Sequence, residues 1–285
     1  MSESTTEKDQ VSEKSPFAGC AILIVAAAVM IFLIGFSITV LFRQFNEIVK
    51  FTDEKPAVVP VVSLEGKEAE LNTLAEKLEA FRLGLGGEET AILELNASEL
   101  NLAIHTYKDF EDLRGMLDVK DISPEEIRFD ISFQLNGKPR LGRKEGEGMF
   151  TSDPRYLNGV LIAEPGLLNQ EVVLQVRDIK VPDKVVPREF LEQMSPYRIA
   201  ERYVGDSTIG DVMGQLTNVE LGDGFIRFEK VAGEVAKDTI SDEDVDLAST
   251  KLFTFLGIAA SIFLLIVAVI LILGLRLKKR RDASV

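Results

Sequence analysis

The sequence predicts an α+β protein in which two transmembrane helices flank one extracytoplasmic domain, built from helices packed on a curved antiparallel sheet. Residues 16–42 and 252–275 carry no charged side chain and are mostly apolar, so each can cross a hydrocarbon core of about 30 Å as a helix. Between them, residues 61–240 alternate between the apolar spacing of helices and that of strands. The sequence therefore predicts one large domain between two spans.

The basic residues after the second apolar run set the expected orientation. The tail of residues 276–285 contains Arg276, Lys278, Lys279, Arg280 and Arg281. Such clusters remain in the cytoplasm, because cationic residues close to a span resist translocation. With two spans, the polar tail of residues 1–15, which we expect to be disordered, is also cytoplasmic. The predicted location is the plasma (inner) membrane, crossed twice, with the central domain outside.

A cleaved signal peptide is the alternative to the first span. The apolar run is too long for one, its basic flank is weak, and no A-x-A site follows it. Cys20 follows Phe17-Ala18-Gly19 as in a lipoprotein processing box, but here the cysteine precedes the apolar run. Since Cys20 is the only cysteine, the outer domain has no intramolecular disulfide.

The first soluble elements follow a short connection. Residues 43–60 predict a juxtamembrane helix and then a linker, because Pro56 and Pro60 interrupt helical structure. Glu65–Leu85 predicts the clearest helix, and one apolar stripe runs along it: Leu71, Leu74, Leu78, Phe81 and Leu85. The glycines between Gly84 and Gly87 are expected to end this helix. They do not predict a phosphate loop, since they follow a helix and lack the Gly-Lys-Ser/Thr ending.

A capping pattern marks the next helix. Thr90–Leu95 predicts a strand, and Asn96 then begins a helix with Glu99 at its third position, which together form a capping box. Asn96-Ala97-Ser98 is also a glycosylation sequon, but capping already explains these residues.

Strict alternation predicts the strongest strand at Ile127–Leu135, followed by a hairpin turn at Asn136-Gly137. Val160–Ala163 and Glu171–Val181 predict two further strands joined through Glu164-Pro165-Gly166. In the second of these the alternation changes register, which indicates a bulge at Arg177-Asp178.

Short helices and one hairpin complete the domain. We expect a helix around Phe190 and Met194, helical pieces at Tyr197–Tyr203 and Ile209–Leu216, and a hairpin of residues 217–221 and 225–229. We expect residues 241–251 to be an acidic stalk. Its Asp242, Asp244 and Asp246 match the start of a calcium loop, but Leu247 and Phe253 occupy the positions that need Gly and Glu.

Composition excludes several classes of function. The net charge of −14 argues against nucleic-acid binding. His105 is the only histidine, and no nucleophile motif accompanies it, so we expect a surface or helix-capping residue. One histidine and one membrane-edge cysteine do not make a zinc site. The sequence therefore predicts a protein that is not an enzyme and has no metal and no cofactor.

The apolar face of the predicted sheet is the candidate binding site. It carries Phe129, Ile131, Phe133, Leu135, Leu174 and Val176. Two interpretations remain open. These side chains form an ordinary closed core, or they line a groove that admits an acyl chain, because lipid pockets are lined in the same way.

Short motifs recur in order along residues 89–230: Glu99-Leu100-Asn101, Asn136-Gly137, Val181-Pro182, Val186-Pro187 and Asp223-Gly224. In this order they resemble the YpmS-like membrane-anchored extracytoplasmic proteins of bacteria. The resemblance implies a half-barrel fold related to lipid-binding domains, without catalytic residues to carry over. The second span and the basic tail depart from that pattern.

Two classes of function follow. The first is a lipid-binding module held at the membrane, with membrane lipid as its partner. The second is a structural or assembly protein of the cell envelope whose outer domain binds another envelope protein. Gly257 and Ser261 form a small-xxx-small pair in the second span, which gives slight support to self-association through the spans.

Overall fold

The computed structural model describes residues 16–142 and 150–240, which belong to two compact units. The first unit comprises residues 1–44 and 253–285, and its described part is the beginning of helix α1 (Pro16–Phe51). The second unit comprises residues 45–252 and holds all the other described elements. The predicted tails, stalk and second span lie outside the described residues.

Large apolar side chains are exposed along α1. Ile24, Met30, Ile31, Ile34 and Ile38 are all largely exposed. None of the helices in residues 16–142 and 150–240 combines the length and hydropathy that a membrane crossing requires.

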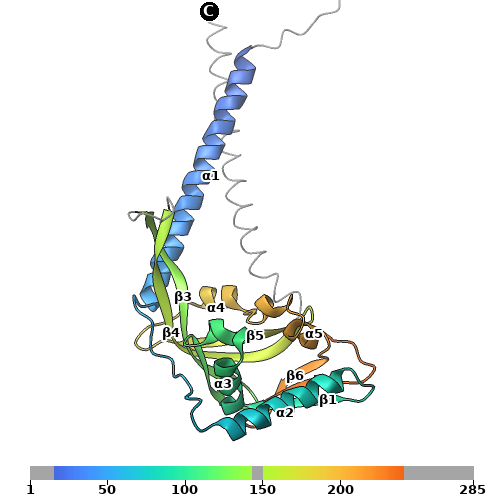
Figure 1. Cartoon of the computed structure of the whole chain (residues 1–285). Helices are drawn as coiled ribbons and strands as arrows, with labels where there is room; N and C mark the ends of the chain where they lie inside the picture. The colour runs from blue at the N-terminus through green and yellow to red at the C-terminus, as the bar shows by residue number, and fades with distance from the viewer. Residues whose placement is uncertain (1–15, 143–149, 241–285) are drawn as a thin grey trace, which may run out of the picture. The chain divides into compact units, whose positions relative to one another are not determined.

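The second unit is α+β, with two antiparallel sheets (Figure 1). Its helices are α2 (Glu68–Leu85), α3 (Ala97–Thr106), α4 (Arg188–Met194) and α5 (Ile209–Met213), with the 3₁₀ turns η1 (Lys108–Leu113) and η2 (Glu201–Tyr203). Its strands are β1 (Ala91–Asn96), β2 (Leu117–Ile122), β3 (Ile127–Leu141), β4 (Phe150–Leu168), β5 (Glu171–Lys180), β6 (Asn218–Leu221) and β7 (Phe225–Lys230). One sheet has the order β2-β3-β4-β5, and the other has the order β1-β7-β6.

The prediction of a single curved sheet is therefore wrong, although the α+β class is confirmed. The second sheet arises because β1 pairs with β7, so that Ala91 lies opposite Lys230. This pairing joins two segments more than 120 residues apart in the chain. Alternation within either strand predicts that it is a strand, but not which partner it takes.

The predictions of an apolar stripe on α2 and of a capping box at the start of α3 are confirmed. In α2 the predicted stripe faces inward, with Leu74, Phe81 and Leu85 buried. The side chain of Asn96 accepts a hydrogen bond from the amide of Glu99, and the Glu99 carboxylate accepts one from the amide of Asn96. The capping box thus closes the first turn of α3.

The side chain of Asn101 completes the pairing of β2, a strand that alternation did not reveal. Its amide donates to the carbonyl of Val119 over 2.9 Å and accepts from the amide of Val119 over 2.7 Å. Asn101 therefore satisfies the backbone of an edge strand that would otherwise be open to further pairing. In Glu99-Leu100-Asn101, the first residue caps α3 and the last binds β2.

Two predicted turns are absent, because β3 and β4 are longer than predicted. Asn136-Gly137 continues β3 past a register irregularity, and Asn136 lies opposite Pro154. Glu164-Pro165-Gly166 likewise stays within β4, and the chain turns at Asn169 and Gln170, whose φ angles are 52° and 62°. Asn-Gly and Pro-Gly permit a turn, but continued pairing with a neighbouring strand overrides that local preference.

The predicted bulge in β5 is confirmed. Ile162 pairs with Asp178 and Ala163 with Val176, so Arg177 is the extra residue. The last hairpin is confirmed too, with β6 and β7 joined through Gly224 at a φ of +86°.

The end of α1 belongs to the domain, which begins at Phe45 and not at residue 61. Phe51 is 1% exposed and packs against Phe190 of α4 at 4.8 Å between ring centroids. Asp53 forms a β-bridge with Tyr156 of β4. The residues predicted as a juxtamembrane helix and linker thus contribute to the core, since their apolar side chains meet α4.

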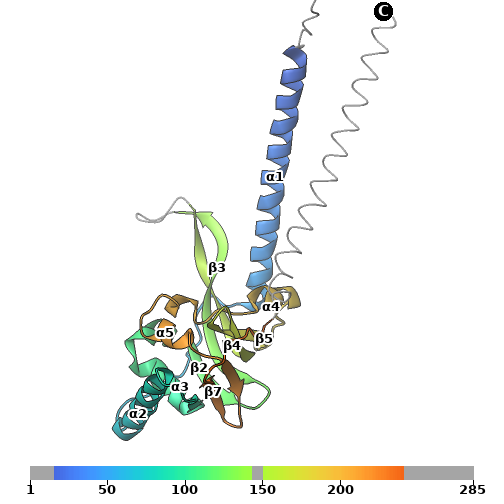
Figure 2. The ribbon, with the colours of Figure 1, turned by 90° about the vertical axis from the view of Figure 1, so that its right-hand side faces the viewer.

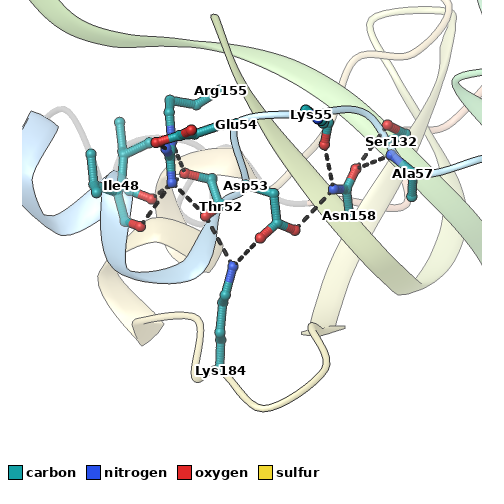
Figure 3. Close-up of polar contacts among 11 residues, drawn as sticks. Ile48, Thr52, Asp53, Glu54, Lys55, Ala57, Ser132, Arg155, Asn158 and Lys184 are labelled. Carbon is teal, nitrogen blue, oxygen red and sulfur yellow. Dashed lines mark hydrogen bonds and ion pairs between the residues drawn. The ribbon is translucent and has the colours of Figure 1, made fainter.

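Five residues, here called the α1 anchor, tie this helix end to the sheet: Thr52, Asp53, Arg155, Asn158 and Lys184 (Figure 3). The guanidinium of Arg155 donates to the carbonyls of Val49 and Thr52 over 3.2 and 2.6 Å. Lys184 donates to Asp53 and to the carbonyl of Thr52. Carbonyls at a helix end lack partners within the helix, so these two cations cap α1.

We expect Asp53→Asn to destabilise the domain at neutral pH by up to about 1 kcal/mol, as for a partly exposed ion pair. The hydrogen bond from Lys184, above all, lowers the pKa of Asp53. A carboxylate with a lowered folded pKa stabilises the fold above its unfolded pKa of about 3.9, and this stability is lost as the pH falls through the folded value. Urea unfolding at pH 7 and at pH 3 should therefore show a difference between parent and variant that shrinks on acidification.

Glu54→Gln is the matched control, because Glu54 is adjacent, highly exposed and 3.5 Å from Arg155. It should change the unfolding free energy little at either pH. A difference for Asp53→Asn that stays constant between the two pH values would contradict the role of its charge.

Candidate functional site: an apolar cavity between the sheets

The buried side chains form separate clusters instead of one core. The four-strand core includes Leu117, Ile127, Ile131, Leu157, Leu161 and Ile179. The three-strand core includes Leu74, Phe81, Leu93, Leu102, Leu216 and Ile226. A small core of Ala200, Tyr203 and Met213 lies beside α5.

An apolar cavity of about 620 Å³ lies where these three cores meet. Side chains from every layer line it: Phe81 of α2, Leu95 of β1, Ile104 of α3, Val119 of β2, Phe129 of β3 and Leu216 after α5. Protein interiors rarely contain voids much larger than a water molecule. A cavity of this volume falls within the range of about 300–1,000 Å³ that is typical of small-molecule pockets.

Helices form one wall of the cavity. Figure 2 shows α2, α3 and α5 on the same side of the strands. The exposed polar members of the wall place the opening between these helices: Glu79 and Arg82 of α2, Asp109 of η1 and Thr208 before α5. Arg82 donates two hydrogen bonds to Glu79 over 2.7 and 2.8 Å, so the one cation that lines the described cavity is already paired.

Tyr203 is a buried polar residue in a wall whose other buried members are apolar. Its side chain is 8% exposed, and its ring meets the ring of Phe110 edge to face at 5.4 Å. Its hydroxyl has no hydrogen-bond partner within residues 16–142 and 150–240. Burial, above all, raises the pKa of Tyr203, so the hydroxyl keeps its proton and can donate it to an acceptor.

The six residues predicted to bind a ligand fall into two groups, those that line the cavity and those within or against the closed core. Phe129 and Leu174 line the cavity. Ile131, Phe133 and Val176 lie on the same sheet face but are buried within the four-strand core, and Leu135 packs against that core. The face is therefore partly cavity wall and partly closed core.

Sequence reasoning missed most of the wall. Residues such as Phe81, Leu95 and Ile104 carry the apolar spacing of ordinary core elements, and that spacing correctly predicts that they point inward. It does not reveal that they face an unfilled volume, because that depends on how far apart the elements lie.

His105 is buried, so the expectation of a surface or capping residue is wrong. The bond between Asn101 and β2 draws this side of α3 against the sheet. Burial, above all, lowers the pKa of His105, while the carboxylate of Asp118 opposes that shift. His105 lies outside the cavity wall, and within the described ranges no group of His, Cys, Asp and Glu side chains is placed to hold a metal ion.

Comparison with protein-family models, with curated proteins and with solved structures finds no match for this chain.

Proposed function

We propose that this protein is a non-enzymatic, membrane-anchored lipid-binding module whose outer domain holds an acyl chain in the cavity between its two sheets. The cavity is the observation that carries the proposal. Its volume suits a small ligand, and its wall is mostly apolar.

The cost of leaving the cavity unfilled supports an occupant. At about 24 cal/mol for each Å³, a void of about 620 Å³ would cost about 15 kcal/mol. This is an upper figure, since the cavity opens partly to water, but it reaches the upper end of the stability of a typical domain, about 5–15 kcal/mol. Each methylene buried there is worth about 0.8 kcal/mol, so an acyl chain would offset much of the penalty.

The membrane location rests on the sequence. The two uncharged runs and the basic tail favour two spans with both termini in the cytoplasm. The apolar side chains exposed along α1 suit a lipid environment. A domain held between two spans would lie close to a supply of acyl chains.

Native mass spectrometry of residues 45–252, expressed without the flanking segments, tests the proposal. We expect a large fraction of the domain to carry one lipid after purification, and the stripped domain to bind an apolar fluorescent dye that competes with added lipid. A domain that unfolds cooperatively in urea, carries no lipid and binds no dye would refute the lipid-binding role. That outcome would favour the assembly role.

A further inference from the structure

We infer that residues Asp238–Ile240, here called the strap, respond to the filling of the cavity, and that a bound acyl chain strengthens their attachment to β4. The strap directly precedes the predicted stalk and second span, so its attachment would report the occupancy of the cavity toward the membrane. This inference rests on the proposed function and adds a regulation of the same cavity. A short stretch of β4 and β5 carries it, because that stretch contacts the strap on one face and the cavity on the other.

The strap takes the place of β3 beside the end of β4. Pairing between β3 and β4 extends to Ala163, which lies opposite Ile127, while β4 continues to Leu168. Beyond that point the amide of Thr239 donates to the carbonyl of Leu167 over 2.9 Å, and the hydroxyl of Thr239 accepts from the amide of Leu167 over 2.8 Å. The end of β4 is thus held between β5 and the strap.

Two further contacts complete the attachment. The carboxylate of Asp238 accepts a hydrogen bond from the amide of Asn169 over 2.7 Å, at the turn between β4 and β5. Ile240 is 5% exposed and forms a small cluster with Leu168 and Val173. A short and partly exposed segment of this kind can detach without unfolding of the domain, since local opening costs least where contacts are few.

Consecutive residues of β5 connect the strap to the cavity. Val172 and Leu174 line the cavity, whereas Val173 between them packs with Ile240 of the strap. Val172 also lies opposite Leu167, to which the strap is bonded. Side chains that face an unfilled volume lack packing partners there. An acyl chain against Val172 and Leu174 would therefore fix the same backbone that the strap binds.

The α1 anchor offers an internal comparison, because it holds β4 at a point away from the cavity. There the backbones of Asp53 and Tyr156 exchange two hydrogen bonds, of 2.8 and 2.9 Å, and neither residue lines the cavity. The next residue, Leu157, belongs to the four-strand core. Filling the cavity should therefore strengthen the attachment of the strap and leave the pairing of Asp53 with Tyr156 unchanged.

Hydrogen exchange of the full chain tests the effect of the ligand on the strap. The protein is stripped of lipid in a fluorinated surfactant, which mixes poorly with hydrocarbon chains, and is then measured with and without saturating oleic acid. Native mass spectrometry counts the bound oleic acid. We expect it to slow exchange at the amides of Leu167, Asn169 and Thr239 by about fivefold or more, and to leave the amides of Asp53 and Tyr156 unchanged.

Detaching the strap tests the reverse effect, because coupling between two sites is reciprocal. In Gly166→Ala the added Cβ would lie 2.5 Å from the hydroxyl oxygen of Thr239 and push the strap away, and Thr239→Val removes that hydroxyl. Both variants should bind oleic acid about two- to tenfold more weakly, the value of one hydrogen bond. Thr239→Ser keeps the hydroxyl, and Gly205→Ala adds a methyl group in open space, so both controls should bind like the parent.

The outcomes separate this inference from the proposed function. Oleic acid that binds but leaves exchange at the strap unchanged would overturn the coupling. Equal slowing at the strap and at Asp53 and Tyr156 would also overturn it, because a general stabilisation of the domain would then explain the effect. Parental affinity in both Gly166→Ala and Thr239→Val would contradict the reverse effect. If no oleic acid binds the parent chain, the proposed function itself fails.

Discussion

The variant Phe133→Asp should lose cooperative folding, whereas Gln134→Asp, one residue further along β3, should remain folded. Phe133 is 6% exposed, belongs to the four-strand core and packs against the ring of Tyr197 at 5.5 Å. Gln134 lies on the opposite, exposed face of the same strand.

The physical reason is the burial of a charge without a partner. An isolated ionised carboxylate in an apolar site costs more than a domain stability of about 5–15 kcal/mol, so the domain unfolds or the acid stays protonated at a large cost. Urea unfolding followed by circular dichroism should show no transition for Phe133→Asp and a nearly unchanged midpoint for Gln134→Asp. A folded Phe133→Asp domain would mean that water reaches this part of the sheet face, and the cavity would then extend beyond its present wall.

Filling the cavity should abolish lipid binding without loss of stability. Ala103 of α3 lines the cavity and is 7% exposed, so the aromatic ring in Ala103→Phe would enter the volume meant for the acyl chain. We expect binding of an apolar dye to fall by more than about tenfold. We expect the unliganded domain to gain about 0.5–2 kcal/mol of stability, as other cavity-filling changes do.

Ala163→Phe is the matched control, because Ala163 is 0% exposed in the four-strand core and does not line the cavity. Overpacking a closed core typically costs about 1–3 kcal/mol, so this variant should unfold at lower urea concentration. Dye titration and urea unfolding of both variants measure the contrast. Equal destabilisation by the two changes would show that the volume beside Ala103 is not free to accept a side chain.

The same pair of alanines shows where sequence reasoning reaches its limit. Both are small apolar residues in regular elements, and no local pattern separates one beside a cavity from one within a closed core. Phe129 and Phe133 of β3 show the same limit. They lie on the same face and in the same alternating pattern, yet only Phe129 lines the cavity. Whether a cavity forms depends on how closely helices and strands pack in space, and these elements lie far apart in the sequence.

Signals confined to a few neighbouring residues were sufficient to predict the helices and strands themselves. The stripe of α2, the capping box of Asn96 and Glu99, the bulge at Arg177 and the hairpin of β6 and β7 each depend on residues that lie close together in the chain. The turn signal failed at Asn136-Gly137, where β3 continues past a register shift and pairing with β4 resumes at Pro139. A preference of about 1 kcal/mol or less yields to several inter-strand hydrogen bonds.

The sequence by itself determined the α+β class, most of the helices and strands, and the inward-facing side of each. Only the tertiary structure decided that β1 pairs with β7, that Phe51 belongs to the core and that the apolar cores stay apart around a cavity. The reason is the range of the forces involved. Periodicity and capping act along a few turns of chain, whereas strand partners and unfilled volume are set by residues that folding brings together from opposite ends of the domain.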